Sequence, residues 1–119
     1  MKKIAIIRCL RTSNNCSGSG CLKAFNNKTN AFAAYGDEVI ELTAFMNCSG
    51  CGDVQMPDNE VGLRKKLDRL VTIGIDTVHL SGCTQKKDAE GVKHECPLIT
   101  RTADYLEQQG ISIVRGTHH

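Results

Sequence analysis

The chain has 119 residues, of which 40% are hydrophobic, enough for one domain with a single core but not for two. A net charge of +2 and 4% aromatic residues argue against a nucleic-acid surface, which usually combines a basic stripe with aromatic side chains. No stretch approaches the roughly 20 apolar residues of a membrane span, and the first apolar run stops at Arg8, which is too short for a signal peptide. We therefore expect one domain over residues 1–119, located in the cytosol.

The predicted elements alternate along the chain. A strand over residues 2–8 contains a continuously apolar run, typical of a parallel strand that helices cover on both faces. Further strands are expected at 38–45, 76–81 and 111–115, each just after a glycine (Gly36, Gly74 and Gly110) of the kind that caps helices. Apolar residues at helical spacing precede each glycine: Leu22, Phe25, Thr29 and Phe32, then Leu63, Leu67, Leu70 and Val71, then Ile99, Ala103 and Leu106.

This order predicts an α/β fold of three layers with a four-stranded parallel sheet. Short connections and right-handed crossovers favour the flavodoxin- or Rossmann-like strand order 2-1-3-4. The first helix is weakened by Asn26, Asn27 and Asn30, which are poor helix formers. Residues 82–96 are polar, and we expect a long loop that moves or closes over something.

Cysteine is the outlying residue type. The seven cysteines are Cys9, Cys16, Cys21, Cys48, Cys51, Cys83 and Cys96. An odd number does not close into an intrachain disulfide framework, and clustered cysteines in a reducing compartment indicate metal binding or thiol chemistry. In air, we expect the pairs Cys48–Cys51 and Cys16–Cys21 to oxidise.

The reactive residues follow the predicted strands. Cys9 follows the first strand, the C-x-x-C pair Cys48 and Cys51 follows the second, Cys83 follows the third and His118 follows the fourth. The carboxyl ends of parallel strands share one sheet edge, where open α/β sheets bind ligands. The sequence therefore predicts a metal site at this edge.

Zinc takes four thiolate or imidazole ligands, and an iron–sulfur cluster takes thiolates. Zinc is the expected cofactor and an iron–sulfur cluster the alternative; the metal ion is the expected partner. The core ligands would be the four cysteines just placed at the strand ends, and the further candidates are His118, Cys96, Cys16, Cys21 and His79. Cys21, beside Leu22, and His79, between Val78 and Leu80, also fit buried structural roles.

Catalytic alternatives are less well supported. A thiol phosphatase or arsenate reductase needs an Arg six residues after its Cys, but Asn15 and Leu22 hold those positions after Cys9 and Cys16. Residues 52–58 after the C-x-x-C pair read as a loop, unlike thioredoxin, where a helix follows. A redox or sulfur-transfer enzyme that uses the Cys48–Cys51 pair stays open as the second hypothesis. The glycine-rich run 16–21 lacks both nucleotide motifs, although its amides suit an anion at a helix start.

The pattern resembles the CGGC-domain family over nearly the whole chain. The resemblance rests on Arg8-Cys9, Cys16 and Cys21 around glycines, the central C-S-G-C of residues 48–51, the V-H-L-S-G-C of residues 78–83, Cys96-Pro97 and the R-G-T-H of residues 115–118. Ser49 stands where the named motif has Gly, which leaves both sulfurs in place. The resemblance implies metal binding, inferred from Cys and His content, and implies no enzymatic activity.

Overall fold

The computed structural model describes residues 1–10, 16–48 and 57–118. Four parallel strands form the central sheet: β1 (Lys2–Arg8), β2 (Ile40–Asn47), β3 (Thr77–Leu80) and β6 (Ser112–Arg115). The helices are α1 (Ser19–Asn27), α2 (Pro57–Ile73) and α3 (Pro97–Gln108), with the 3₁₀ turns η2 (Asn30–Tyr35) and η3 (Gly82–Thr84). A short ribbon consists of β4 (Gln85–Lys87) and β5 (Lys93–Glu95).

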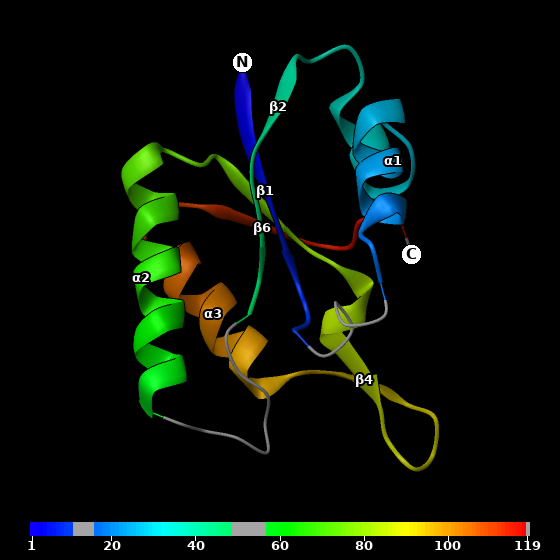
Figure 1. The fold of residues 1–119 in the computed structure, drawn as a ribbon. Helices are drawn as coiled ribbons and strands as arrows, with labels where there is room; N and C mark the ends of the chain where they lie inside the picture. Colours follow the sequence, from blue (N-terminus) through cyan, green and yellow to red (C-terminus); the bar gives the residue numbers. More distant parts are fainter. Residues whose placement is uncertain (11–15, 49–56, 119) are drawn as a thin grey trace.

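The predicted α/β class and strand order are confirmed. The sheet runs β2-β1-β3-β6 with every neighbour parallel, so the chain's first strand lies inside and its second at the edge (Figure 1). The β1–β2 register shifts between Ile4 and Ala5, which inserts Thr43 as an extra residue in the edge strand. All four carboxyl ends consequently face the same way.

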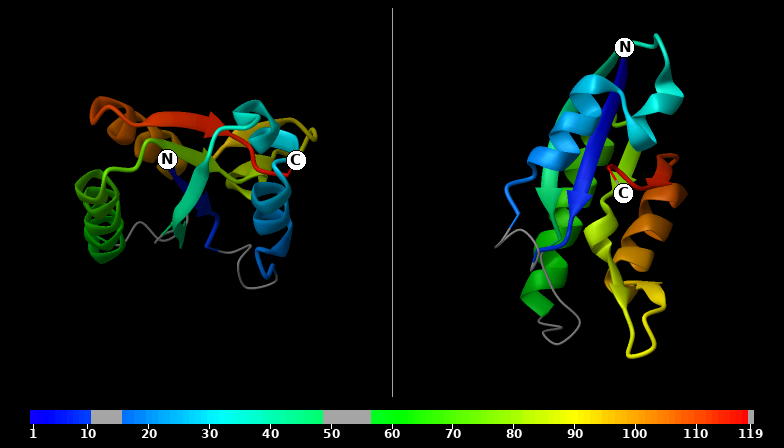
Figure 2. Two further views of the ribbon diagram at one scale, coloured as in Figure 1. Left: turned by 90° about the horizontal axis from the view of Figure 1, so that it is seen from above. Right: turned by 90° about the vertical axis from the view of Figure 1, so that its right-hand side faces the viewer.

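Two cores lie on opposite faces of the sheet. Ala5 and Ile7 of β1 pack with α2 and α3, whereas Ile4 and Ile6 pack with α1 and η2 around Phe32. This alternation follows from the period-two side-chain geometry of a strand. The views in Figure 2 show the resulting three layers, with α1 on one side of the sheet and α2 and α3 on the other.

The first helical segment is shorter than its apolar spacing predicted. Helix α1 ends at Asn27 because Lys28 adopts a left-handed conformation (φ 52°), and the chain resumes as η2. The asparagines at this point explain the break, since their side chains compete for backbone hydrogen bonds. Gly74 (φ 80°) and Gly110 (φ 88°) take the left-handed conformation expected after the two later helices.

Residues 82–96 are more ordered than the expected loop. They form η3 and the antiparallel β4–β5 ribbon, in which Lys86 pairs with His94. The ribbon is held to the body by Glu95, whose carboxylate accepts hydrogen bonds from Arg115 (2.8 Å) and Thr100 (2.7 Å). Burial alone would raise the pKa of Glu95, but these hydrogen bonds outweigh it and hold that pKa below its ordinary value.

No helix in the described ranges is long and apolar enough to cross a membrane.

Candidate thiol site at the carboxyl edge of the sheet

Three cysteines lie where three neighbouring strands end. Cys9 directly follows β1, Cys48 directly follows β2, and Cys83 lies in η3, which continues from β3. Cys9 and Cys48 are each only 3% exposed, and Cys83 is half-buried. Parallel pairing brings these positions together because β1 lies between β2 and β3.

The backbone at the end of β1 donates to two of these sulfurs. The N–H of Cys9 donates to Cys83 Sγ at 3.2 Å, and the N–H of Leu10 donates to Cys48 Sγ at 3.4 Å. Two consecutive N–H groups after β1 therefore donate to two different sulfurs. One sulfur follows β3 and the other follows β2, the strands on either side of β1. Such N–H groups stabilise a sulfur more when it carries negative charge, since hydrogen bonds to ionised acceptors are the stronger ones.

The third sulfur has a cationic donor. Lys86 of β4 places its Nζ 3.0 Å from Cys9 Sγ and 3.1 Å from the carbonyl oxygen of Cys83. An ammonium group has no lone pair, so the sulfur must accept, and its thiolate form gains a charge-assisted hydrogen bond. The β4–β5 ribbon therefore supplies a positive charge to this site. We name Cys9, Cys48 and Cys83 the thiol cluster.

The thiol cluster is not an assembled metal centre. Within the described residues, no group of three or more Cys, His, Asp or Glu side chains is arranged to hold a metal ion. Cys51, the fourth predicted core ligand, lies outside those residues. A metal that binds here would therefore draw the sulfurs of the thiol cluster closer together.

Two other predicted residues, Cys21 and His118, meet on the face of the sheet that α1 covers. Cys21 of α1 is 1% exposed, and its Sγ lies 3.2 Å from Thr117 Oγ1, 3.5 Å from Ser81 Oγ and 3.6 Å from His118 Nδ1. The His118 ring packs against Gly20, where an added Cβ would lie 3.0 Å from Nε2. Cys21 belongs to the core under α1, whereas Cys48 belongs to the core under α2 and α3.

His79 is held by hydrogen bonds through both ring nitrogens. It is fully buried, with Nδ1 2.9 Å from the carbonyl oxygen of Gly116 and Nε2 2.7 Å from the hydroxyl of Tyr35. A carbonyl only accepts, so Nδ1 carries the proton and Nε2 accepts from Tyr35. Desolvation lowers the pKa of His79 below its ordinary value, which keeps the ring neutral. In this arrangement the ring has no lone pair left for a metal.

Cys16 and Cys96 occupy the flanks of the site. Cys16 is half-buried ahead of α1, and its carbonyl oxygen accepts a hydrogen bond from Arg8 at 3.1 Å. Cys96 is the N-cap residue of α3 and packs against the α2–α3 core. Cys16, Cys21, Cys83 and Cys96 are free thiols.

Sequence reasoning missed Lys86 and Arg8. Lys86 stands beside Lys87 in a polar segment, and nothing in that segment's sequence indicates that its side chain contacts Cys9. Arg8 offered a clearer signal, because a charged residue at the end of an apolar parallel strand needs a special environment.

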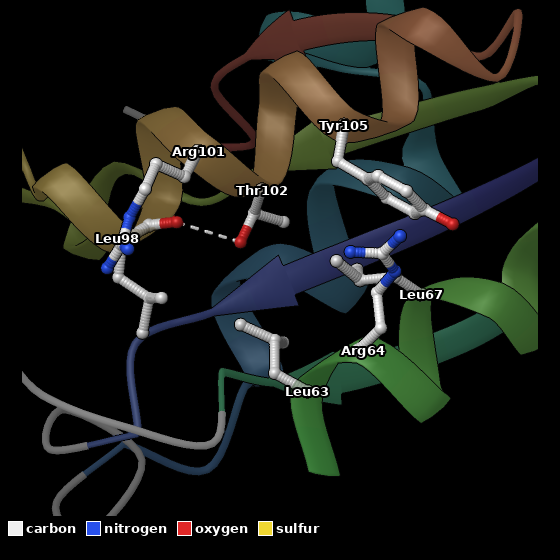
Figure 3. A pocket seen from close by; sticks show the side chains of 7 residues that line it. All are labelled: Leu63, Arg64, Leu67, Leu98, Arg101, Thr102 and Tyr105. Carbon is white, nitrogen blue, oxygen red and sulfur yellow. Dashed lines mark hydrogen bonds between the residues drawn. The ribbon is translucent and has the colours of Figure 1, made fainter. Parts of the chain in front are cut away.

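A surface groove among the described residues lies away from the thiol cluster. An open groove of about 210 Å³ runs between α2 and α3, over a floor that includes Leu63, Leu67 and Leu98 (Figure 3). The guanidinium of Arg64 stacks on the ring of Tyr105 at 3.9 Å across this groove. None of its described lining residues is a cysteine or histidine, so the thiol chemistry is not assigned to this groove.

Fold and site define an α/β protein with cysteines gathered at the carboxyl edge of a parallel sheet. The CGGC domain family model matches residues 3–118, so the chain belongs to the CGGC-domain family. The chain is also similar to "Uncharacterized protein MJ0582" of Methanocaldococcus jannaschii, with 34% identity over 124 residues, covering 98% of this chain and 86% of that protein. No solved structure matches the chain.

Proposed function

We propose that this protein binds a thiophilic metal through Cys9, Cys48, Cys51 and Cys83. The observation that carries the proposal is the donor set around the thiol cluster: each of its three sulfurs accepts a hydrogen bond from an N–H group. Hydrogen bonds of this kind favour the deprotonated sulfur, and the thiolate is the form that ligates metals. Family membership and the seven cysteines are compatible with this function.

Metal binding would also offset the free-energy cost of burying these sulfurs as thiolates. A thiolate that is almost fully enclosed is costly unless charge nearby compensates it. Lys86 supplies one positive charge to Cys9 at 3.0 Å, and a divalent metal would balance the remaining sulfurs. Side-chain rotations of the cysteines, with Cys51 as the fourth ligand, would complete a tetrahedral site.

Zinc is the metal we propose first, with an iron–sulfur cluster as the alternative. Four thiolates suit both, and the N–H···S contacts described above are also the contacts that tune the potential of iron–sulfur clusters. Either metal requires reduced cysteines, so we place the protein in the cytosol.

The test is metal content after purification without oxygen. We expect one zinc per chain and a colourless protein, or iron with sulfide and a brown one. Cys48→Ser and Cys83→Ser should each lower the metal stoichiometry, whereas Cys96→Ser, the matched control on α3, should leave it unchanged. Metal-free protein, or equal loss in all three variants, would contradict the proposal.

A second candidate is a thiol-dependent redox or sulfur-transfer enzyme. The contact between Lys86 and Cys9 favours it, because a neighbouring ammonium group raises the thiolate fraction of a cysteine and so its reactivity. The sequence pattern assigns this chemistry to the Cys48–Cys51 pair, and the Lys86 contact adds Cys9 as a second candidate nucleophile. In metal-free protein, mass-spectrometric mapping after brief alkylation would find Cys9, Cys48 or Cys51 labelled ahead of Cys16 and Cys96. Faster labelling of the latter two would exclude this candidate.

A further inference from the structure

A buried cation lies at the N-terminal end of helix α1. Arg8, the last residue of β1, is only 8% exposed. Its guanidinium packs over the ring of Phe45 at 4.7 Å and donates a hydrogen bond from Nη1 to the carbonyl oxygen of Cys16. A Cβ built on Gly18, the N-cap residue of α1, would lie 2.9 Å from the same Nη1.

This position is electrostatically unfavourable as it stands. The N-terminus of a helix carries a partial positive charge, and its first N–H groups lack partners within the helix. Helix α1 has no acidic residue in its first turn and no side-chain cap. Two exposed hydroxyls also lie at this end: Ser17 Oγ accepts from the N–H of Ser19 at 3.3 Å and lies 3.0 Å from Ser19 Oγ. Two positive groups therefore meet without an anion in the described structure.

One N–H donor of the guanidinium has no hydrogen-bond acceptor among the described residues. Nε of Arg8 is buried and has no acceptor among the described residues. A buried, charged donor without an acceptor is rare in folded proteins, because its lost hydration is not replaced. A group that supplies negative charge and acceptor oxygens at this place would satisfy both the guanidinium and the helix end.

We propose that Arg8 and the first turn of α1 form a binding site for a small oxyanion, a phosphate or sulfate group. Guanidinium groups match such oxyanions through their planar fork of donors, and helix N-termini bind them through backbone N–H groups. Gly18 fits this role because its positive φ (82°) and missing side chain let the helix end approach Arg8 closely. Because Cys9 follows Arg8, the anion binds beside the thiol cluster, on the α1 side of the sheet edge.

The site is independent of metal binding and is tested separately. The probe is inorganic phosphate, with sulfate as a second oxyanion, titrated into the full chain at constant ionic strength and followed by calorimetry and thermal melting. We expect saturable binding that chloride does not reproduce. Arg8→Met should weaken phosphate binding at least tenfold, and Arg8→Lys, which keeps the charge but loses the fork, should weaken it less.

The matched control is Lys23→Met, which removes an exposed positive charge from the same helix away from its N-terminus and should leave phosphate affinity unchanged.

A second variant, Ser19→Asp, tests the site if Arg8→Met does not fold, because it places a carboxylate of the protein where the anion would bind. It should raise the melting temperature and abolish the phosphate response. Phenyl phosphate in place of phosphate distinguishes a phosphomonoester ligand, which would bind more tightly, from free phosphate. The proposal would be overturned if phosphate changed the melting temperature no more than chloride does. It would also be overturned if Ser19→Asp bound phosphate with the same affinity as the parent protein.

Discussion

Two polar side chains, His79 and Lys86, show how single residues contribute to the fold and to the proposed site. His79 contributes to the fold, although its residue type made it a candidate ligand. Its ring stacks on Phe32 with centroids 4.2 Å apart, and both of its nitrogens are hydrogen-bonded. Burial raises the pKa of Tyr35, so its hydroxyl stays protonated and continues to donate to His79 at neutral pH.

The first prediction follows from this buried histidine. Because the folded-state pKa of His79 is lowered by desolvation, the unfolded chain takes up a proton first as the pH falls. The stability that depends on the neutral ring is therefore complete above about pH 6.5, the ordinary histidine pKa, and is lost as the pH falls toward the folded-state value. Urea unfolding between pH 7.5 and 5 should show this loss, at up to about 1.4 kcal/mol per pH unit.

The pH dependence of the free energy of unfolding should be measured for His79→Gln and for His94→Gln. His94 is the control because it lies exposed on the ribbon, where its Nε2 lies 2.7 Å from Asp88 Oδ2. The His79 variant should flatten the pH dependence and the His94 variant should keep it. Parallel pH profiles for the His79 variant and the parent chain would contradict the assignment.

Lys86 is the charged residue that contacts the thiol cluster directly. Its ammonium group donates to Cys9 Sγ, so Lys86→Met removes a charge-assisted hydrogen bond and keeps most of the side-chain volume. Residues that hydrogen-bond metal ligands typically contribute about 10–100-fold to affinity, and we expect zinc to bind at least tenfold more weakly. Competition with a chromophoric chelator measures this. Lys87→Met, at the adjacent exposed position, is the control; equal affinities in both variants would refute the role of Lys86.

At the scale of elements, the α1 side of the sheet depends on a short 3₁₀ turn. Element η2 carries Phe32, which is completely buried against Ile4 and Ile6 and meets Phe25 edge-to-face at 5.4 Å. A single aromatic ring therefore fills much of the smaller core. The weak helix propensity of residues 26–30 ends α1, and this packing then fixes the segment that follows.

Phe32→Ala should therefore lower the free energy of unfolding by about 3–5 kcal/mol, the usual cost of deleting a fully buried aromatic side chain. Val39→Ala, at a position that is 61% exposed, should change it by less than about 0.5 kcal/mol. Denaturant titration of both variants is the measurement. A loss below about 1 kcal/mol for Phe32→Ala would show that η2 contributes little to the core.

The elements also show where sequence patterns stop being informative. Apolar periodicity identified α2, α3 and the buried strand β1, because each must bury a defined face. The β4–β5 ribbon has no such face: Lys86 and Lys87 pair with His94 and Lys93, so neither strand shows an alternating pattern. Its position is fixed by tertiary contacts, such as the Glu95–Arg115 ion pair, that only the folded chain reveals.

At the scale of the whole molecule, the strand order is enough to predict that three of the cysteines lie close together. Placing the first strand between the second and third brings Cys9, Cys48 and Cys83 to neighbouring strand ends, and the alternating element order was enough to expect this. Which face each residue takes was harder to predict. Cys21 and His118 meet under α1 because α1 crosses one face of the sheet, whereas α2 and α3 cover the other. Cys21 and His118 consequently lie together but apart from the thiol cluster.

The central claim is that the sulfurs of the thiol cluster, together with Cys51, share one metal. X-ray absorption at the zinc edge of anaerobically loaded protein tests it most directly, because the spectrum reports the identity and distance of the ligands. We predict a shell of four sulfurs at about 2.3 Å, which falls to three sulfurs in Cys83→Ser. A shell of nitrogen and oxygen ligands at about 2.0–2.1 Å, unchanged in that variant, would contradict the assignment.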